Sequence, residues 1–193
     1  MDEKIKTELM AYSRQVYGFC YHLTGNRMDA DDLYQDTFLT AWEKRGNFQD
    51  MLAKNHMCQR DAGNEDSSNQ MRNYLLGIAA NIWRNKQRKK IRRSRIAPFD
   101  EKEDALAGVV SREPSPESDF LQQEMLREVR RQVAALPDKL RVVVVMYYTG
   151  EMSTEEIAAR LEMPAATVRS RLSKARKRMR KGLEGNGYER LYG

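Results

Sequence analysis

The 193-residue sequence contains few of the residues that build catalytic and metal sites. It has two histidines and two cysteines, and its aromatic content is only 8%. Cys20 and Cys58 are too few for a disulfide framework, which favours free thiols in a reducing compartment. A Cys/His zinc site would need both cysteines with His22 and His56, but Cys20 and His22 stand two residues apart and point to nearly opposite sides of a helix. We therefore predict no metal site and no cofactor.

Long hydrophobic segments are also missing. No apolar run approaches the roughly 18 residues that cross a membrane, and the N-terminal residues MDEKIKTELM lack the apolar core of a signal peptide. These absences predict a cytoplasmic protein without membrane insertion. The sequence also shows no nucleophile–base arrangement and no glycine-rich phosphate loop, so we do not expect an enzyme.

The sequence is instead rich in charge, and the charge is separated into blocks around a net value of +6. Nine Lys or Arg and no acid lie in 71–95, and eight Lys or Arg and no acid lie in 169–181. Five acids and no base lie in 28–43, and 98–119 holds seven acids against two bases. The two basic blocks can neutralise nucleic-acid phosphates. A single charge block could be the solvated face of a helix in an ordinary helical protein. Four separate blocks are harder to explain in that way.

Hydrophobic residues recur with a helical period, which predicts an all-α protein. One amphipathic stripe consists of Ala30, Leu33, Tyr34, Thr37, Phe38, Ala41 and Trp42. Shorter stripes lie in 16–23 and 74–82, and 24–26 has the composition of a turn. These helices predict a small bundle within residues 1–96.

Two segments interrupt the helical pattern. Residues 50–70 include DAGNEDSSN and predict a loop insertion in the bundle. Residues 97–118 combine prolines with an acidic excess and predict a flexible linker. The chain is therefore expected to form two small helical domains, 1–96 and 119–183, followed by a tail at 184–193.

The second domain has the pattern of a helix-turn-helix. The four valines in 142–145 would suit a strand by propensity, but the apolar positions around them keep helical spacing. Ser153 and Glu156 then form the pattern of a capping box that opens the next helix, and Pro164 opens the last one. In such a motif the N-terminal half of the last helix enters the major groove of DNA.

The residues of that last helix predicted to contact DNA are Thr167, Arg169, Ser170, Arg171, Ser173, Lys174 and Arg176. Arginine can read guanine with two parallel hydrogen bonds. Arg176 and the basic residues after it are more naturally placed on phosphates. A basic amphipathic helix bound to RNA or a membrane is the weaker alternative, because a complete helix-turn-helix precedes this helix.

The basic helix in 71–95 carries a second set of candidate contacts, which are Asn81, Trp83, Arg84, Asn85 and Arg88. A surface with an exposed aromatic ring, amides and cations suits unstacked bases, because rings stack on bases and cations hold the backbone. Core packing of Trp83 is an equally open reading of that residue.

The acidic helix in 28–43 has a polar face opposite its apolar stripe. Asp32, Gln35, Asp36 and Leu39 lie on this face, which we call the docking face. Carboxylates around an exposed leucine predict a surface for a basic partner helix. Paired catalytic carboxylates are a poor reading, because no histidine or phosphate-binding loop accompanies them.

These segments together resemble the extracytoplasmic-function sigma factors of bacterial RNA polymerase. VYGFCYHLTGNRMDADDLYQDTFLTAWEKRGNF and MRNYLLGIAANIWRNKQRKKIRR resemble the two halves of sigma region 2. LPDKLRVVVVMYYTGEMSTEEIAARLEMPAATVRSRLSKARKRMRK resembles region 4. The sequence departs from the family pattern in its long loop at 50–70 and in Glu162, which stands where a turn glycine is common.

The resemblance implies an alternative sigma factor that recognises promoters. The docking face would bind the β′ clamp helices of core RNA polymerase, and region 4 would also contact the β flap. Asn81 and its neighbours would handle the melted −10 element, and the last helix would read the −35 element of promoter DNA. The resemblance also implies an anti-sigma factor as a partner. A stand-alone helix-turn-helix regulator remains the alternative, but it leaves the first basic helix and the docking face unexplained.

Overall fold

The computed structural model describes residues 2–46, 65–96 and 118–185, and the secondary structure in these ranges is entirely helical. The helices are α1 (Asp2–Ala11), α2 (Ser13–Thr24), α3 (Arg27–Glu43), α5 (Glu65–Ile96), α6 (Ser118–Ala134), α7 (Asp138–Tyr148), α8 (Thr154–Leu161) and α9 (Ala165–Glu184). The prediction of an all-α fold is therefore confirmed. Most of the predicted loop at 50–70 lies in 47–64, and all but the last residue of the predicted linker at 97–118 lies in 97–117. Both of these ranges are outside the described residues.

Helices α2 and α3 form a hairpin whose turn the sequence predicts. Gly25 ends α2 with a φ of 80°, a left-handed conformation that favours glycine. Asn26 then caps α3, because its side chain accepts a hydrogen bond of 2.8 Å from the backbone N–H of Asp29. The predicted stripe of α3 faces the core, with Ala30, Leu33, Thr37 and Ala41 fully buried and Tyr34, Phe38 and Trp42 packed against them.

Helix α5 begins earlier than the sequence predicts. Its first turn starts at Glu65, so the last part of the expected loop at 50–70 is helical. Ser, Asn and Asp favour turns and helix starts alike, so a polar run does not separate the two in a sequence. Acidic residues also favour the first turn of a helix, because the N-terminus carries the positive end of the helix dipole.

Helices α7, α8 and α9 form the predicted helix-turn-helix. All four valines of α7 are buried and helical, because α7 is enclosed by other helices on several sides. Ser153 and Glu156 make the full capping box at the start of α8. Glu162 adopts the left-handed conformation at the turn, with a φ of 53°. The capping box and the turn geometry therefore agree with the sequence analysis.

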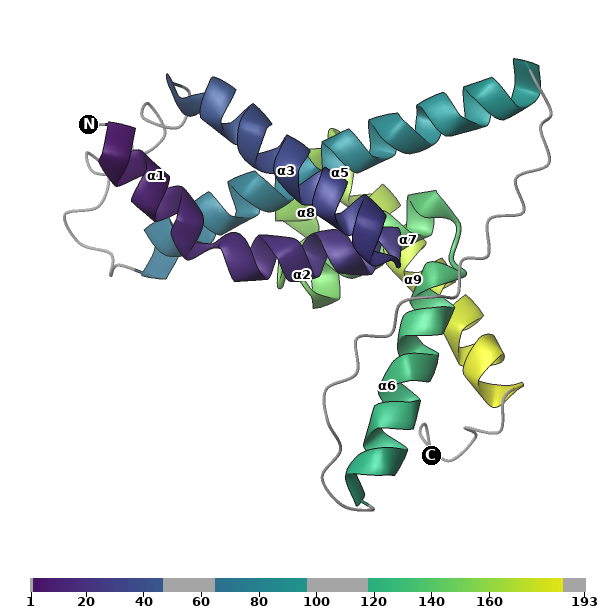
Figure 1. Ribbon diagram of the computed structural model, residues 1–193. Helices are drawn as coiled ribbons and strands as arrows, with labels where there is room; N and C mark the ends of the chain where they lie inside the picture. Colours follow the sequence, from purple (N-terminus) through teal and green to yellow (C-terminus); the bar gives the residue numbers. More distant parts are fainter. Residues whose placement is uncertain (1, 47–64, 97–117, 186–193) are drawn as a thin grey trace.

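The N-terminal helices α1–α5 and the C-terminal helices α6–α9 pack against each other and share a hydrophobic core (Figure 1). Helix α2 contacts α6 and α7, and α5 contacts α7 and α8. The lower part of α6 and the end of α9 project away from this core (Figure 1). The sequence predicts two domains, and no pattern in it indicates that they pack together.

Candidate nucleic-acid and partner interfaces

Helix α9 presents its predicted DNA-contacting side chains on the surface. Val168 and Leu172 face the core, as their spacing predicts, and Ala175 joins them. The opposite face is open: Arg169, Ser170, Ser173, Lys174 and Arg176 are exposed, and Thr167 and Arg171 are half-buried. The structure thus places all seven predicted residues on one helix whose apolar side is anchored to α7 and α8.

Two arginines of α9 already have partners within the chain. Arg169 pairs with Glu155 of α8 at 3.0 Å, and both side chains are largely exposed. Arg176 donates a hydrogen bond of 2.9 Å to the hydroxyl of Tyr148, and its guanidinium lies over the rings of Tyr147 and Tyr148. The bond to Tyr148 raises the pKa of Arg176. Arg176 therefore also holds α9 to α7, a role that helical spacing alone does not reveal.

The predicted contacts of α5 divide into exposed and occupied residues. Asn85 and Arg88 are exposed. Arg84 is half-buried and donates a hydrogen bond of 3.3 Å to the backbone carbonyl of Leu161 in α8. Asn81 approaches the neighbouring carbonyl of Arg160 at 3.5 Å. Helix α8 therefore engages part of the surface that the sequence assigns to nucleic acid.

Of the two readings left open for Trp83, the structure shows core packing and not an exposed ring. Its side chain is only 2% exposed, and the guanidinium of Arg141 in α7 lies 5.7 Å from the centre of the ring. The buried face of α5 thus continues past Ile82, where the amphipathic stripe was expected to end. The physical reason is that the C-terminal helices cover a second side of α5, which single-helix periodicity does not reveal.

The electrostatic environment of Arg84 is unfavourable for a cation. Burial lowers the pKa of Arg84, the positive charges of Arg88 and Arg171 lower it further, and Glu162 opposes the shift. Arg171 belongs to α9, so cations predicted for separate DNA elements come together at this point. A bound polyanion would relieve this repulsion.

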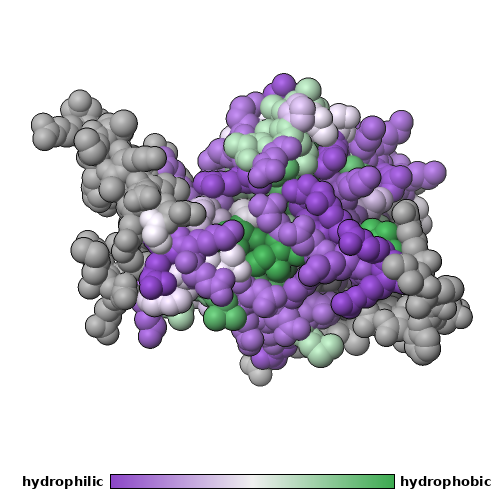
Figure 2. Space-filling view, turned by 90° about the horizontal axis from the view of Figure 1, so that it is seen from above, coloured by the Kyte–Doolittle hydropathy of each residue, from purple (hydrophilic) through white to green (hydrophobic). Residues whose placement is uncertain are grey.

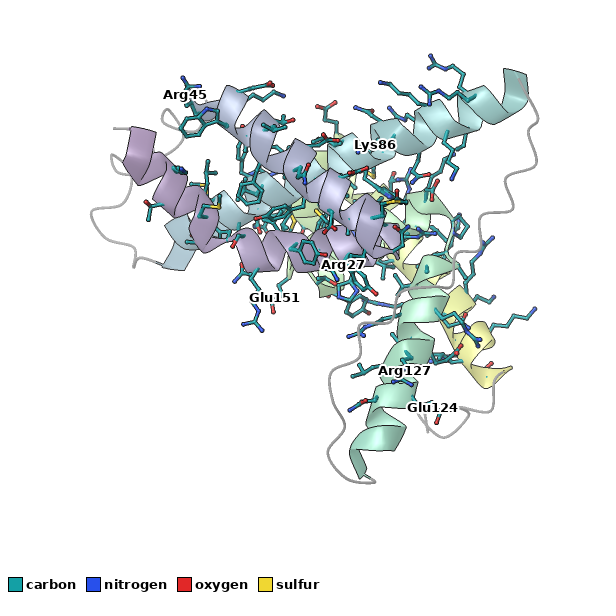
Figure 3. The ribbon with its side chains drawn as sticks, viewed as in Figure 1. Arg27, Arg45, Lys86, Glu124, Arg127 and Glu151 are labelled. Carbon is teal, nitrogen blue, oxygen red and sulfur yellow. The ribbon has the colours of Figure 1, made fainter. Side chains whose placement is uncertain are left out.

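The docking face of α3 is largely open. Asp32 and Gln35 are exposed, and the Leu39 side chain is 62% exposed. Asp36 is half-buried and pairs with Lys86, which projects from α5 toward α3, at 2.7 Å (Figure 3). The structure therefore keeps the four predicted residues on one face, and one of them already binds a lysine. A basic partner would meet the acidic and apolar groups that such an interface requires.

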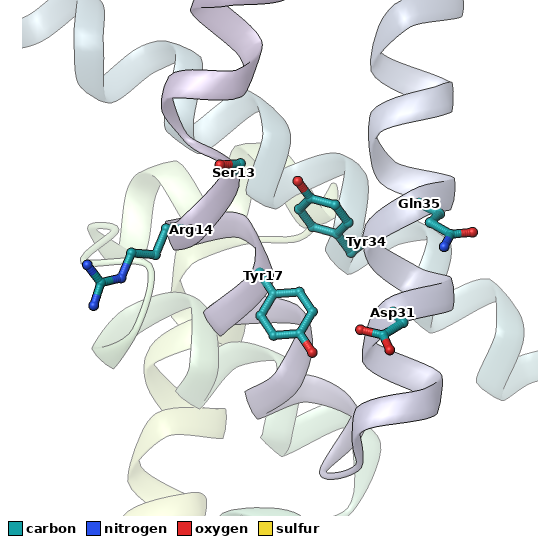
Figure 4. Close-up of a pocket in the computed structure, with 6 residues that line it drawn as sticks. All are labelled: Ser13, Arg14, Tyr17, Asp31, Tyr34 and Gln35. Carbon is teal, nitrogen blue, oxygen red and sulfur yellow. The ribbon is translucent and has the colours of Figure 1, made fainter. Parts of the chain in front are cut away.

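A shallow cavity of about 490 Å³ lies beside the docking face, between α2 and α3 (Figure 4). Tyr17 and Asp31 point toward one another across it, and Gln35 stands at its edge (Figure 4). The hydrogen bond to Asp31 raises the pKa of Tyr17. Sequence analysis does not identify this cavity, because its two walls come from different helices.

The rejected zinc site is not assembled by the described residues. Cys20 is buried in the core, and burial raises the pKa of its thiol to about 12. His56 and Cys58 lie outside the described residues.

The described residues on the face seen in Figure 2 are mainly hydrophilic, with isolated hydrophobic patches. Within the described ranges, no helix has the length and apolar character needed to cross a membrane.

Comparisons with known proteins agree with this arrangement. The Sigma-70 region 2 family matches residues 9–53, and the Sigma-70 region 4 family matches residues 126–179. The first match contains α2, α3 and the docking face, and the second contains the helix-turn-helix.

Relatives match along nearly the whole chain. The sequence is 26% identical to the ECF RNA polymerase sigma factor SigW of Bacillus subtilis, over 89% of this chain and 84% of that protein. It is 28% identical to the ECF RNA polymerase sigma factor SigE of Mycolicibacterium smegmatis, over 88% of this chain and 57% of that longer protein. The RNA polymerase sigma-H factor of Pseudomonas aeruginosa is 26% identical over 91% of this chain and 84% of its own length.

A solved structure shows the same fold. The sigma factor RpoE of Bartonella quintana, in complex with the anti-sigma factor NepR, aligns with a TM-score of 0.63 and 21% identity, covering 94% of this chain and 98% of that chain. The chain thus has both sigma regions in the same order as these relatives, and it has the same fold as the solved structure. The chain therefore belongs to the extracytoplasmic-function sigma factors, the alternative sigma factors that direct transcription initiation by RNA polymerase.

Proposed function

We propose that this protein binds core RNA polymerase through the docking face of α3 and delivers it to promoters that carry matching −35 and −10 elements. The open recognition face of α9 supports this proposal most strongly, because a helix-turn-helix braced by a buried α7 presents seven DNA-contacting candidates together. In this proposal the protein supplies recognition and strand opening in the cytoplasm, and the polymerase supplies the catalysis.

The two DNA elements fall to different helices. Arg169, Ser170 and Arg171 would read bases of the −35 element, because the N-terminal half of a recognition helix meets base edges. Asn81, Asn85 and Arg88 of α5 would hold the melted −10 strand by amide and phosphate contacts. Trp83 has no such role while it is buried. The corresponding domains are 1–96 for region 2 and 119–183 for region 4, joined by 97–118.

The partner proteins follow from the charge of the exposed faces. An acidic face centred on Leu39 fits a basic helix of the polymerase β′ subunit, and region 4 would contact the β flap. An anti-sigma factor is also proposed, because the structurally similar RpoE was solved in complex with one. A stand-alone regulator is the weaker proposal, since it assigns no role to the docking face.

Charge reversal on α3 tests the docking face. Asp32→Arg, alone and with Asp36→Arg, should abolish association with core polymerase in a pull-down, because arginines would repel a basic partner helix. Glu124→Arg is the matched control, since Glu124 is an exposed acid on α6. We expect the control to bind core polymerase as the unchanged protein does. Equal binding by all variants would refute the docking face, and loss in the control would show a general charge effect.

A further inference from the structure

An acid of α8 holds one of the predicted base-reading arginines of α9. Arg169 donates a hydrogen bond of 3.0 Å from its guanidinium to Oε1 of Glu155. The other carboxylate oxygen, Oε2, accepts a hydrogen bond of 2.8 Å from the hydroxyl of Thr154. Both oxygens of Glu155 are therefore engaged, one by its own helix and one by the recognition helix. Among the described residues, Arg169 is the one DNA-contact candidate of α9 that pairs with an acid.

The start of α8 gives the Glu155 carboxylate a fixed support. Ser153 and Glu156 form the capping box that begins the helix, and Thr154 and Glu155 lie between them. The apolar side of α8 is buried, so this helical turn is anchored to the core. The hydrogen bond from Thr154 is the main cause that lowers the pKa of Glu155, and a lowered pKa favours the charged form. The structure thus presents a held, charged carboxylate to Arg169.

The ion pair contributes little to the stability of the fold. The side chains of Arg169 and Glu155 are 59% and 67% exposed, and exposed ion pairs add little to the free energy of unfolding. The same carboxylate stands beside the helix that the proposed function presents to DNA, and DNA is a polyanion that repels it. Glu155 therefore lowers the affinity for DNA in general without a comparable gain in stability.

The ion pair affects the two kinds of DNA contact of an arginine differently. A guanidinium can bind a backbone phosphate anywhere along the duplex, or it can bind the O6 and N7 atoms of one guanine. A phosphate carries a full negative charge, so a carboxylate on the same guanidinium repels it. The edge of a guanine is a neutral acceptor, and the guanidinium keeps further N–H groups for it. Glu155 therefore weakens phosphate contacts, which carry no sequence information, more than base contacts.

We propose that Glu155 is a specificity-determining residue of −35 recognition that acts through Arg169. It withholds this guanidinium from the phosphates of unrelated DNA and leaves it to a guanine of the −35 element. Binding to unrelated DNA is weakened more than binding to the −35 element, so the ratio of the two affinities rises. Specificity of this kind comes from a repulsive group that acts against the wrong partner. The inference rests on the proposed function, which assigns α9 to the −35 element.

Glu155→Gln in the full chain tests the inference, because glutamine keeps the shape of the side chain and removes its charge. Fluorescence titrations at several salt concentrations compare two duplexes of equal length. One duplex carries the −35 sequence that the unchanged protein selects from a randomised library, and the other carries the same bases in scrambled order. We expect Glu155→Gln to bind the scrambled duplex about two- to fivefold more tightly, the range of an exposed charge interaction, with a salt slope steeper by about one. Binding to the −35 duplex should change by less than about twofold.

Further variants separate this effect from a general change of charge. Glu162→Gln is the matched control, because Glu162 is an exposed acid at the turn between α8 and α9, and it should affect both duplexes alike. Thr154→Val removes the hydroxyl that holds Glu155 and should shift the affinity ratio in the same direction by a smaller factor. In an Arg169→Ala background, Glu155→Gln should leave the ratio unchanged, because both substitutions act on one contact. Thermal unfolding checks that every variant is folded.

The inference is overturned if Glu155→Gln binds the scrambled duplex no more tightly than the unchanged protein does. It is also overturned if Glu162→Gln lowers the affinity ratio by the same factor, or if Glu155→Gln lowers the ratio equally in the Arg169→Ala background. Sequence selection by the unchanged protein together with an unaltered ratio in Glu155→Gln would contradict this inference alone. If the unchanged protein selects no sequence from the library, the assignment of α9 to the −35 element fails, and the inference fails with it.

Run-off transcription with core polymerase gives a second readout of the same property. Unrelated duplex DNA is added as a competitor to reactions that contain either the unchanged protein or Glu155→Gln. Transcription with Glu155→Gln should be inhibited at a competitor concentration about two- to fivefold lower, because more of the protein is held on unrelated DNA. Equal inhibition of the two reactions would overturn the inference.

Discussion

The two basic helices of this protein, α5 and α9, have similar charge but different surroundings. Helix α9 buries one apolar stripe and leaves its cationic face open. Helix α5 is covered on two sides, because α2 and α3 pack on one side and α7 and α8 on the other. Its cations are accordingly divided, with Arg88 exposed and Arg84 bound to α8. A basic run thus indicates a nucleic-acid surface, but the fold decides how much of it is available.

The largest loss of stability is expected for a substitution of Trp83, the buried ring that distinguishes α5 from α9 most clearly. Trp83→Ala removes a buried ring and should lower the free energy of unfolding by about 3–5 kcal/mol. A solvent-exposed base-stacking tryptophan would give a much smaller loss. Chemical denaturation of the full chain measures the change, and Met28→Ala, at a residue that is 74% exposed, is the control for an exposed apolar side chain.

Removing the hydrogen bonds that Arg141 of α7 makes to α2 and to the end of α6 should have the next largest effect. Arg141→Met keeps much of the side-chain volume but removes the hydrogen bonds to Leu23 and to the carbonyls of Ala134 and Leu136. Burial disfavours the charged form of Arg141 and lowers its pKa, so replacing it by a neutral side chain removes this unfavourable contribution. This gain offsets part of the stability lost with the hydrogen bonds, and we expect the free energy of unfolding to fall by about 2 kcal/mol. Thermal unfolding followed by circular dichroism measures it. A neutral outcome would show that the hydrogen bonds of Arg141 do not stabilise the packing of the two halves.

Within α9, base reading and phosphate binding should be separable. Arg171→Ala should cost about 1–3 kcal/mol of discrimination at one −35 position, whereas Arg178→Ala should weaken all sequences alike and lower the salt slope by about one. Binding to a set of −35 variants at several salt concentrations measures both quantities. If both substitutions changed sequence preference equally, the division of α9 into reading and holding parts would be wrong.

The smallest effect on stability is expected from removing the ion pair between α8 and α9. Arg169 and Glu155 are both largely exposed, and exposed pairs contribute little to stability. Glu155→Gln should therefore leave the melting temperature nearly unchanged while freeing Arg169 for DNA. We expect equal or tighter −35 binding in a fluorescence titration. Weaker binding would show that Glu155 positions Arg169 for the groove.

Local features of this fold follow from the sequence because their causes are local. The apolar stripe of α3, the turn at Gly25 and the capping box at Ser153 all depend on residues within one or two helical turns. The valine run of α7 was also assigned correctly, since spacing outweighed strand propensity. The same local rules placed α9 and its exposed cations.

The features that the sequence did not reveal arise between distant segments. Trp83 is buried because Arg141 and α7 cover it, and Arg84 is occupied because α8 ends beside it. The space beside Gly77 is filled by the side chain of Arg160, more than eighty residues later. No periodicity within α5 encodes these partners, so the packing of the two halves had to come from the structure.

Run-off transcription with purified bacterial core polymerase on a promoter library tests the central claim most directly. The account predicts transcripts that require this protein and that share one −35 and one −10 sequence. Asp32→Arg with Asp36→Arg should abolish them. The contradicting result would be that the protein neither binds core polymerase nor supports transcription by it. That result would refute the assignment of these surfaces and favour a regulator that binds duplex DNA without the polymerase.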